Sequence, residues 1–284
     1  AVHMGIDVPP KEMDWFNTHR ISIHPEPCRE QSAGQSAQAR DGGRGVWLGN
    51  LNQRRWFYYK QWMLAGDYDA IWLIDIRDVV FQANPFEGKV PELALYVDKK
   101  ELTSFQQAKI VPCLGQQIWT QMKASGMPNM CGGTVLGNAK GIADLCDGMT
   151  KLAEEAAAKS KAEGSHKCMR NDQHLLNYYA FRHKITKIGA NQNTVVYERY
   201  DGIALNAGSP CDENKHMSKS MVLMNKQQQP LAIVHKWDRC ERLQKWVKSG
   251  KLFKAYKVPP STPPFVQAAP MKAASKVSAT KEPV

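Results

Sequence analysis

The chain has 284 residues, of which 43% are hydrophobic and 23% are charged, as in soluble globular proteins that bury a full core. No run of eighteen or more apolar residues occurs, so the sequence contains no transmembrane segment. The formal net charge is +11, yet the last 49 residues hold eleven Lys and Arg against three acids, so most of the excess lies there. The charges of the remaining residues nearly cancel, which argues against a nucleic-acid-binding fold and favours a basic appendage.

The composition along the chain suggests one folded domain with an extension. We expect residues 1–250 to form the domain, residues 27–50 to be a mobile loop rich in Gly, Ser, Gln and Arg, and residues 251–284 to be a Pro/Ala/Lys-rich tail. The seven cysteines include no CxxC pair or Cys/His cluster, so zinc is not expected, and their pairing stays open. The chain begins Ala-Val-His without an initiator Met, which is compatible with a processed or partial product.

The first elements are short strands and an aromatic helix. Residues 2–6 and 21–24 have strand patterns, with a short helix at 11–18 between them. Residues 52–64 place Trp56, Tyr59 and Met63 at helical spacing, which predicts an amphipathic helix next to the following strand. Near its N-terminus, Arg54 and Arg55 could reach an anionic ligand, although solvated arginines are the alternative.

Residues 67–86 form the most informative stretch. Residues 70–74 predict a central strand buried on both faces, and the chain then runs into Asp75, Arg77 and Asp78. Acids at the end of such a strand lie where open α/β sheets bind ligands. Because no basic residue on a helix face is expected to pair with them, the two carboxylates are suited to binding Mg²⁺ or Mn²⁺. The alternative is a turn whose acids are solvated.

The middle of the chain alternates strands and helices. Residues 92–97 predict a strand, and residues 98–125 mix loop with a helix at 116–122. In 129–138 the pair Gly132 and Gly133 enters a strand, which indicates close backbone approach by a ligand or a neighbouring strand. The following helix contains Ile142, Leu145, Cys146 and Met149 at helical spacing and extends over 151–164.

The last third adds a capped helix and a histidine at a strand end. Asn171 or Asp172 is expected to cap a helix whose apolar side is Leu175, Leu176 and Tyr179, and capping alone would explain the Asp. Strands are predicted at 185–188, 194–197, 221–225 and 231–234. The last one ends at His235, a good metal ligand where acids converge and otherwise an ordinary hydrogen-bonded side chain. Leu243, Trp246 and Val247 predict a short helix before Gly250.

Four stretches in this order resemble a known class. The segments YDAIWLIDIRDVVFQANPF, CGGTVLGNAKGI, DQHLLN and IVHKWDR resemble GT-A nucleotide-diphospho-sugar glycosyltransferases, most closely the glycogenin-like and plant cell-wall branch. The resemblance covers about residues 55–239. It implies an α/β fold with a Rossmann-like mixed central sheet flanked by helices. It also implies transfer of a sugar from a nucleotide sugar, UDP-linked, to an unknown glycan, protein or lipid acceptor, with retention of configuration.

The resemblance assigns roles to ten residues around a leaving diphosphate, whose charge a divalent cation stabilises. The ligands of Mn²⁺ or Mg²⁺ would be Asp75, Asp78 and His235. The donor would be bound by Asp75, Arg77, Arg55, Gly132, Gly133 and Lys236. The catalytic residues that face the transferred sugar would be Asp172 and Gln173.

Two departures from the class keep an alternative open. The acids read Asp-Ile-Arg-Asp in place of Asp-x-Asp, so a bulge re-aims Asp78 or only one acid binds metal. Residues 2–6 resemble the second strand of the class, so we expect the first βα unit to be absent and the chain to be a fragment or to have an incomplete donor site. The alternative is a catalytically silent structural subunit, docked through its basic tail on a larger assembly or an anionic surface. The resemblance implies the Golgi or ER lumen for a eukaryotic member.

Overall fold

A computed structural model describes residues 2–4, 23–25, 51–75, 78–162, 171–185, 193–207, 212–219 and 222–249. The chain divides into two units, Leu48–Val258 and a second one made of Ala1–Trp47 with Pro259–Val284. In the latter, strands β1 (Val2–Met4) and β2 (Ile23–Pro25) pair in parallel. Both were predicted as strands. The helix predicted at 11–18, the loop at 27–50 and the tail at 251–284 lie outside the described residues.

The larger unit alternates helices and strands, as an α/β fold requires. Its helices are α2 (Leu51–Ala65), α3 (Ser104–Leu114), α4 (Gln116–Ala124), α5 (Ala139–Ala162), α6 (Asp172–Arg182) and α7 (Glu241–Lys248), and short 3₁₀ turns occupy Glu213–His216 and Trp237–Arg239. Its strands are β3 (Ile71–Ile74), β4 (Val79–Phe81), β5 (Leu93–Lys99), β6 (Asn129–Gly137), β7 (Thr194–Tyr197), β8 (Ala204–Asn206) and β9 (Ile233–His235).

These strands form two mixed sheets. The first has the order β3-β6-β5-β7, with β6 antiparallel to both neighbours and β7 parallel to β5. The second has the order β4-β9-β8, with β4 antiparallel and β8 parallel to β9. The predicted α/β architecture with a mixed sheet flanked by helices is therefore confirmed.

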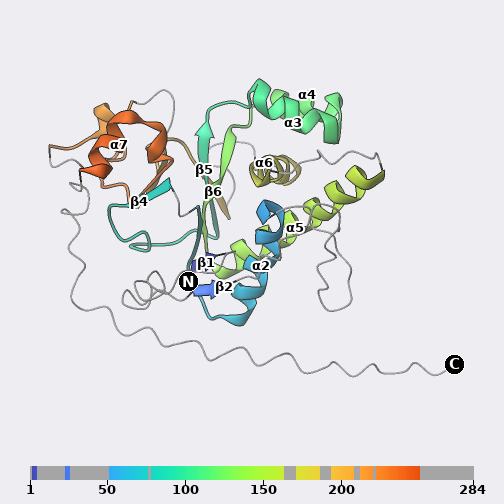
Figure 1. Cartoon of the computed structure of the whole chain (residues 1–284), viewed down its shortest axis with the longest axis horizontal. Coiled ribbons are helices and arrows are strands. Elements are labelled where there is room, and N and C mark those ends of the chain that lie inside the picture. The colour runs from blue at the N-terminus through green and yellow to red at the C-terminus, as the bar shows by residue number, and fades with distance from the viewer. Residues whose placement is uncertain are drawn as a thin grey trace. The chain divides into compact units, whose positions relative to one another are not determined.

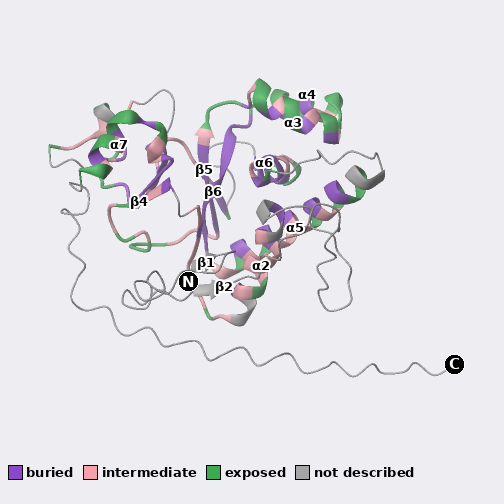
Figure 2. Cartoon of the chain, viewed as in Figure 1, coloured by how far each residue is buried: buried purple, intermediate pink, exposed green. Residues whose placement is uncertain are grey.

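The position predicted for β3 was wrong. Among the described residues β3 pairs with β6 alone, and of its four residues only Leu73 is fully buried. The apolar run at 70–74 is equally compatible with an edge strand covered on its open side, which pattern alone does not distinguish from a central strand. In the first sheet the strand that is buried throughout is β6, where all nine residues lie inside (Figure 2).

A layer of helices covers the first sheet. Helix α6 packs on β6, α5 packs on α6, and α2 packs on α5 (Figure 1). The predicted stripe of α5 is confirmed, since Ile142, Leu145, Cys146 and Met149 are all fully buried. Trp56 and Met63 of α2 are buried as well, but the main partner of α2 is α5 and not the following strand.

The second sheet has its own core. Val80 of β4, Leu205 of β8 and Val234 of β9 pack with Leu243 and Trp246 of α7 in one apolar cluster. This confirms the predicted amphipathic helix near residue 243. A further apolar cluster joins the two sheets, because Ala94, Tyr96 and Leu136 of the first sheet pack with Ala204 and Ile233 of the second.

Several elements differ from the sequence-based expectation. Helix α3 lies in the stretch 98–125, which was expected to mix loop with a helix at 116–122. It contains Pro112 in its last turn, shortly before the helix ends at Gly115. Strands β4 and β8 have three residues each, too few for a periodicity signal. The strand predicted at 221–225 was wrong over its described part, where only isolated bridges form at Leu223 and Met224. No helix in the described ranges has the length and apolar character to cross a membrane.

Candidate active site

The chain moves from one sheet to the other between the two acids of the Asp-Ile-Arg-Asp stretch. The N–H of Asp75 donates to the carbonyl of Gly133 at 3.1 Å and so extends the β3–β6 ladder. The N–H of Lys236 donates to the carbonyl of Asp78 at 2.8 Å and extends the β4–β9 ladder. The spacing of the acids therefore reflects a change of sheet. Arg77, predicted to bind the donor, lies outside the described residues.

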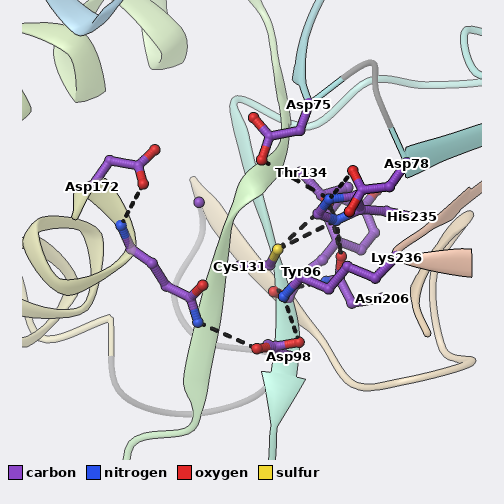
Figure 3. Close-up of polar contacts among 12 residues, drawn as sticks. Asp75, Asp78, Tyr96, Asp98, Cys131, Thr134, Asp172, Asn206, His235 and Lys236 are labelled. Carbon is purple, nitrogen blue, oxygen red and sulfur yellow. Dashed lines mark hydrogen bonds and ion pairs between the residues drawn. The ribbon is translucent and has the colours of Figure 1, made fainter. Parts of the chain in front are cut away.

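Three predicted metal ligands converge at this crossing. Nε2 of His235 lies 3.3 Å from Oδ1 of Asp78 and 4.0 Å from Oδ2 of Asp75 (Figure 3). Asp78 and His235 are buried, whereas the side chain of Asp75 is partly exposed. Within the described ranges no group of three or more His, Cys, Asp or Glu side chains is already arranged around one metal position. Asp75, Asp78 and His235 therefore lie near one another without forming a ready cation site.

The other nitrogen of His235 is held by the protein. Nδ1 lies 2.9 Å from Oδ1 of Asn206 and 3.0 Å from Oγ1 of Thr134. The amide nitrogen of Asn206 donates to the carbonyls of Tyr96 and Val97, so the Asn206 oxygen is the atom that faces the ring. Nδ1 is therefore the protonated donor, and Nε2 is the atom presented to the carboxylates. This arrangement is the one that orients metal-binding histidines.

Buried charges surround His235. Burial lowers its pKa, but hydrogen bonds with Asp78 and Cys131 outweigh burial and raise the pKa to about 9. Sγ of Cys131 lies 3.4 Å from Nδ1. Burial raises the pKa of the Cys131 thiol, yet the hydrogen bond with His235 and the charge of Lys236 bring it below its ordinary value. These surroundings therefore favour a proton on the His235 ring, and a cation bound at Nε2 would have to displace that proton.

The two glycines of β6 occupy a bulge that makes room for the site. Residues 131–134 stand opposite Tyr96 alone on β5, which displaces the β6 backbone toward His235. A Cβ atom on Gly133 would lie 2.3 Å from Oδ2 of Asp75 and 2.8 Å from Cε1 of His235. A Cβ atom on Gly132 would lie 3.2 Å from Oδ2 of Asp172. The predicted close approach is thus made by side chains of the site itself.

Arg55 links the acids on the two sides of β6. Its guanidinium donates to Oδ1 of Asp75 at 2.6 Å and to the carbonyl of Gly132 at 3.0 Å, and it forms an ion pair with Asp172. The expectation of acids without a basic partner on a helix face was wrong, as was the alternative of a solvated arginine. The aromatic pattern of α2 predicted the helix but gave no sign that this arginine points inward.

Asp172 and Gln173 begin helix α6 beside the bulge. Asn171 is the N-cap, and its side chain accepts from the N–H of Gln173 at 2.8 Å, which confirms the predicted cap. Asp172 is buried and occupies the first helical turn, where a carboxylate is favoured by the helix dipole. The amide of Gln173 donates to Asn129 at 3.1 Å and to Asp98 at 3.3 Å. Asn171 is therefore the capping residue, whereas Asp172 forms an ion pair with Arg55.

Asp98 is a site residue that the sequence analysis missed. It is the penultimate residue of β5 and forms an ion pair with Nζ of Lys236 at 2.7 Å, with both side chains largely buried. Burial lowers the pKa of Lys236, but the Cys131 thiol and the Asp98 carboxylate outweigh burial and raise it. The strand-end argument used for Asp75 would have found Asp98, because it follows the strand predicted at 92–97.

Most of these groups line one cavity of about 630 Å³. It is lined by each of the nine predicted site residues that the structure describes, namely Arg55, Asp75, Asp78, Gly132, Gly133, Asp172, Gln173, His235 and Lys236. The cavity also includes residues that were not predicted, among them Asp98, Cys131, Thr103, Phe105 and Arg239. Six segments far apart in the sequence, near residues 55, 75, 98, 131, 171 and 235, therefore build a single polar site.

A buried histidine beside the cavity gives a pH prediction. His174 is 3% exposed, and burial together with Lys109 lowers its pKa to about 4. In the unfolded chain the His174 ring takes up a proton below a pKa of about 6.5, whereas in the folded chain it stays neutral down to about pH 4. The contribution of His174 to the free energy of unfolding is therefore fully present above pH 6.5 and is lost as the pH falls toward 4. By pH 5 we expect a loss of about 2 kcal/mol from this residue, measured by urea unfolding.

The matched control for His174 is on the same helix. His174→Gln should remove most of the decrease in the free energy of unfolding between pH 7 and pH 5. His183→Gln changes an exposed histidine and should leave most of that decrease in place. Equal declines in wild type and His174→Gln would show that His174 is not kept neutral by its surroundings.

Comparison with known proteins gives little beyond the geometry. No protein-family model and no curated protein matches the chain. Among solved structures it is similar to the galactosyltransferase LgtC in complex with donor and acceptor sugar analogues. The identity is 14%, the TM-score is 0.35, and the alignment covers 79% of this chain and 81% of that one. A likeness at this level carries no argument about function, which has to rest on the cavity.

Proposed function

We propose that the protein is a metal-dependent glycosyltransferase that uses a nucleotide-diphospho-sugar, UDP-linked, as donor. The observation that supports this most is the single cavity that joins Asp75, Asp78 and His235 to the pair Asp172 and Gln173. Transfer from such a donor requires stabilisation of a leaving diphosphate next to groups that face the sugar carbon. The cavity brings these two kinds of group together.

The residues present fit a divalent cation. Asp78 and the oriented Nε2 of His235 would hold Mn²⁺ or Mg²⁺, and Asp75 would join them with the oxygen that faces His235. When bound, the cation would neutralise the charge that develops on the diphosphate. Asn206 and Thr134 keep the His235 ring in place by holding Nδ1. This support is what distinguishes a ligand from an incidental histidine.

The basic residues have positioning roles in this proposal. Arg55 is engaged with two carboxylates, so it fixes Asp75 and Asp172 relative to β6. Lys236 is paired with Asp98 at the cavity wall and adds positive potential near the acid cluster. Asp172 faces the transferred sugar, and a retaining outcome is proposed with it in contact with the anomeric centre. Gln173, held by Asn129 and Asp98, orients the sugar hydroxyls.

One observation favours the second candidate, a catalytically silent subunit derived from such a transferase. Arg55 forms ion pairs with both Asp75 and Asp172, and acids that are paired within the protein need no bound ligand to be stable. The two candidates differ in whether a metal and a nucleotide can replace those internal contacts.

Isothermal titration with UDP tests the proposal. We expect micromolar binding of UDP in the presence of Mn²⁺ and at least a tenfold loss in EDTA, since the diphosphate has to meet the acids through a cation. UDP-glucose and UDP-galactose would then be tested for donor hydrolysis. A folded protein that binds no UDP with Mn²⁺ would favour the silent subunit.

A further inference from the structure

The rim of the cavity carries an exposed aromatic ring. Of the described residues, Phe81, Phe86 and Phe105 are the large apolar side chains that stand exposed, and Phe105 is the most exposed of them at 62%. Phe105 is also the one that lines the cavity. A single exposed apolar side chain is ordinary, but one that stands in the lining of a polar cavity is a candidate contact for a ligand.

Phe105 is presented by a well-fixed helix start. The N–H of Thr103 donates to Oε1 of Gln106 at 3.0 Å, and Gln106 is buried, so the first turn of α3 is closed around Phe105. Ile110 and Cys113 anchor the same helix in the core. The ring therefore projects from a rigid support, which lowers the entropic cost of binding something against it.

The surroundings of the ring leave much of it open. His174 of α6 lies beside it with ring centroids 5.9 Å apart, and Nζ of Lys109 lies 6.0 Å from its centroid. The neighbouring cavity wall is polar and includes Thr103, Asn171 and Gln173. An aromatic face next to hydroxyl and amide groups matches a sugar ring, which has apolar C–H faces and hydroxyl groups along its edge.

The position of the ring separates it from the acid cluster. Asp78 and His235 belong to the β4–β9 side of the cavity, whereas Phe105 stands on α3, which packs on α6. Gln173 is one residue from His174, the neighbour of Phe105, so the ring lies next to the residues proposed to face the transferred sugar. We propose that Phe105 is the stacking platform of an acceptor subsite and that the acceptor is a saccharide. This inference rests on the proposed function.

Saturation-transfer difference NMR tests the subsite without any turnover. The probes are maltose, cellobiose and lactose with UDP and Mg²⁺, with irradiation of the aromatic protein resonances. Wild type should give signals from the sugar C–H protons of at least one disaccharide. Phe105→Ala should reduce these signals about fivefold to tenfold, since one aromatic contact is worth about 1 kcal/mol, while Phe105→Trp should keep them.

Phe86→Ala is the matched control, because it removes another exposed phenylalanine that does not line the cavity. It should leave the signals unchanged. Equal disaccharide signals in wild type and Phe105→Ala, or none in wild type although UDP binds, would overturn the subsite alone. Loss of the UDP signals in Phe105→Ala would overturn it too and place the nucleotide on the ring. Absence of both UDP and disaccharide binding in wild type would instead refute the proposed function together with the subsite.

Discussion

Arg55→Met is expected to lower the free energy of unfolding by about 3 kcal/mol and to abolish sugar transfer. The change leaves the buried carboxylate of Asp172 without its cation and removes a donor from the carbonyl of Gly132. An unpaired buried charge is costly, so Asp172 would take up a proton or shift, and Asp75 would lose its tether. Urea unfolding at pH 7 measures the first effect.

The control for Arg55 is on the same helix. Lys60→Met removes the ion pair with Asp147, in which both side chains are partly exposed, and should cost less than about 1 kcal/mol. The double change Arg55→Met with Asp172→Asn should recover part of the stability without recovering transfer. If Arg55→Met unfolds within 1 kcal/mol of wild type, the ion pair with Asp172 does not hold the site together.

Asp78→Asn is expected to reduce Mn²⁺-dependent UDP affinity at least a hundredfold while the protein stays folded. The amide keeps the size of the side chain but loses the charge that faces Nε2 of His235 and would hold the cation. Titration calorimetry with UDP, with and without Mn²⁺, measures the loss. His235→Gln should have a similar effect, because it removes the nitrogen ligand on the opposite side.

Asp144→Asn is the matched control for Asp78, since Asp144 is an exposed acid paired with Lys140 and does not line the same cavity. It should bind UDP like wild type. Undiminished metal-dependent binding by Asp78→Asn would remove Asp78 from the metal site and leave the Asp-Ile-Arg-Asp stretch as a structural crossing.

The sequence predicted those site residues that lie at the ends of strands or at the beginning of helices. Asp75 and His235 come directly at strand ends, and Asn171 has the composition of a cap, so local patterns are enough to find them. The glycine pair signalled close approach because only glycine leaves room there. These features depend on a few neighbouring residues, and the structure places them in one cavity.

The features of the site that were not predicted depend on contacts between segments far apart in the sequence. The inward direction of Arg55 is decided by Asp75 and Asp172, which are 20 and 117 positions further along the chain. Asn206 holds His235 from a three-residue strand that has no periodicity of its own. The edge position of β3 depends on which strand pairs with it. Such partners are fixed by tertiary packing, which outweighs local propensity.

The two-sheet construction of the site has a kinetic consequence. Asp75 extends the four-stranded sheet, whereas Asp78 and His235 belong to a sheet whose strands have three residues each. Strands this short would open easily if they were exposed, but β8 and β9 are buried throughout and share an apolar cluster with β5 and β6. Opening of the smaller sheet would therefore expose part of the core that both sheets share. A donor held across both sheets would then dissociate slowly, because its release by such opening would require that shared core to loosen.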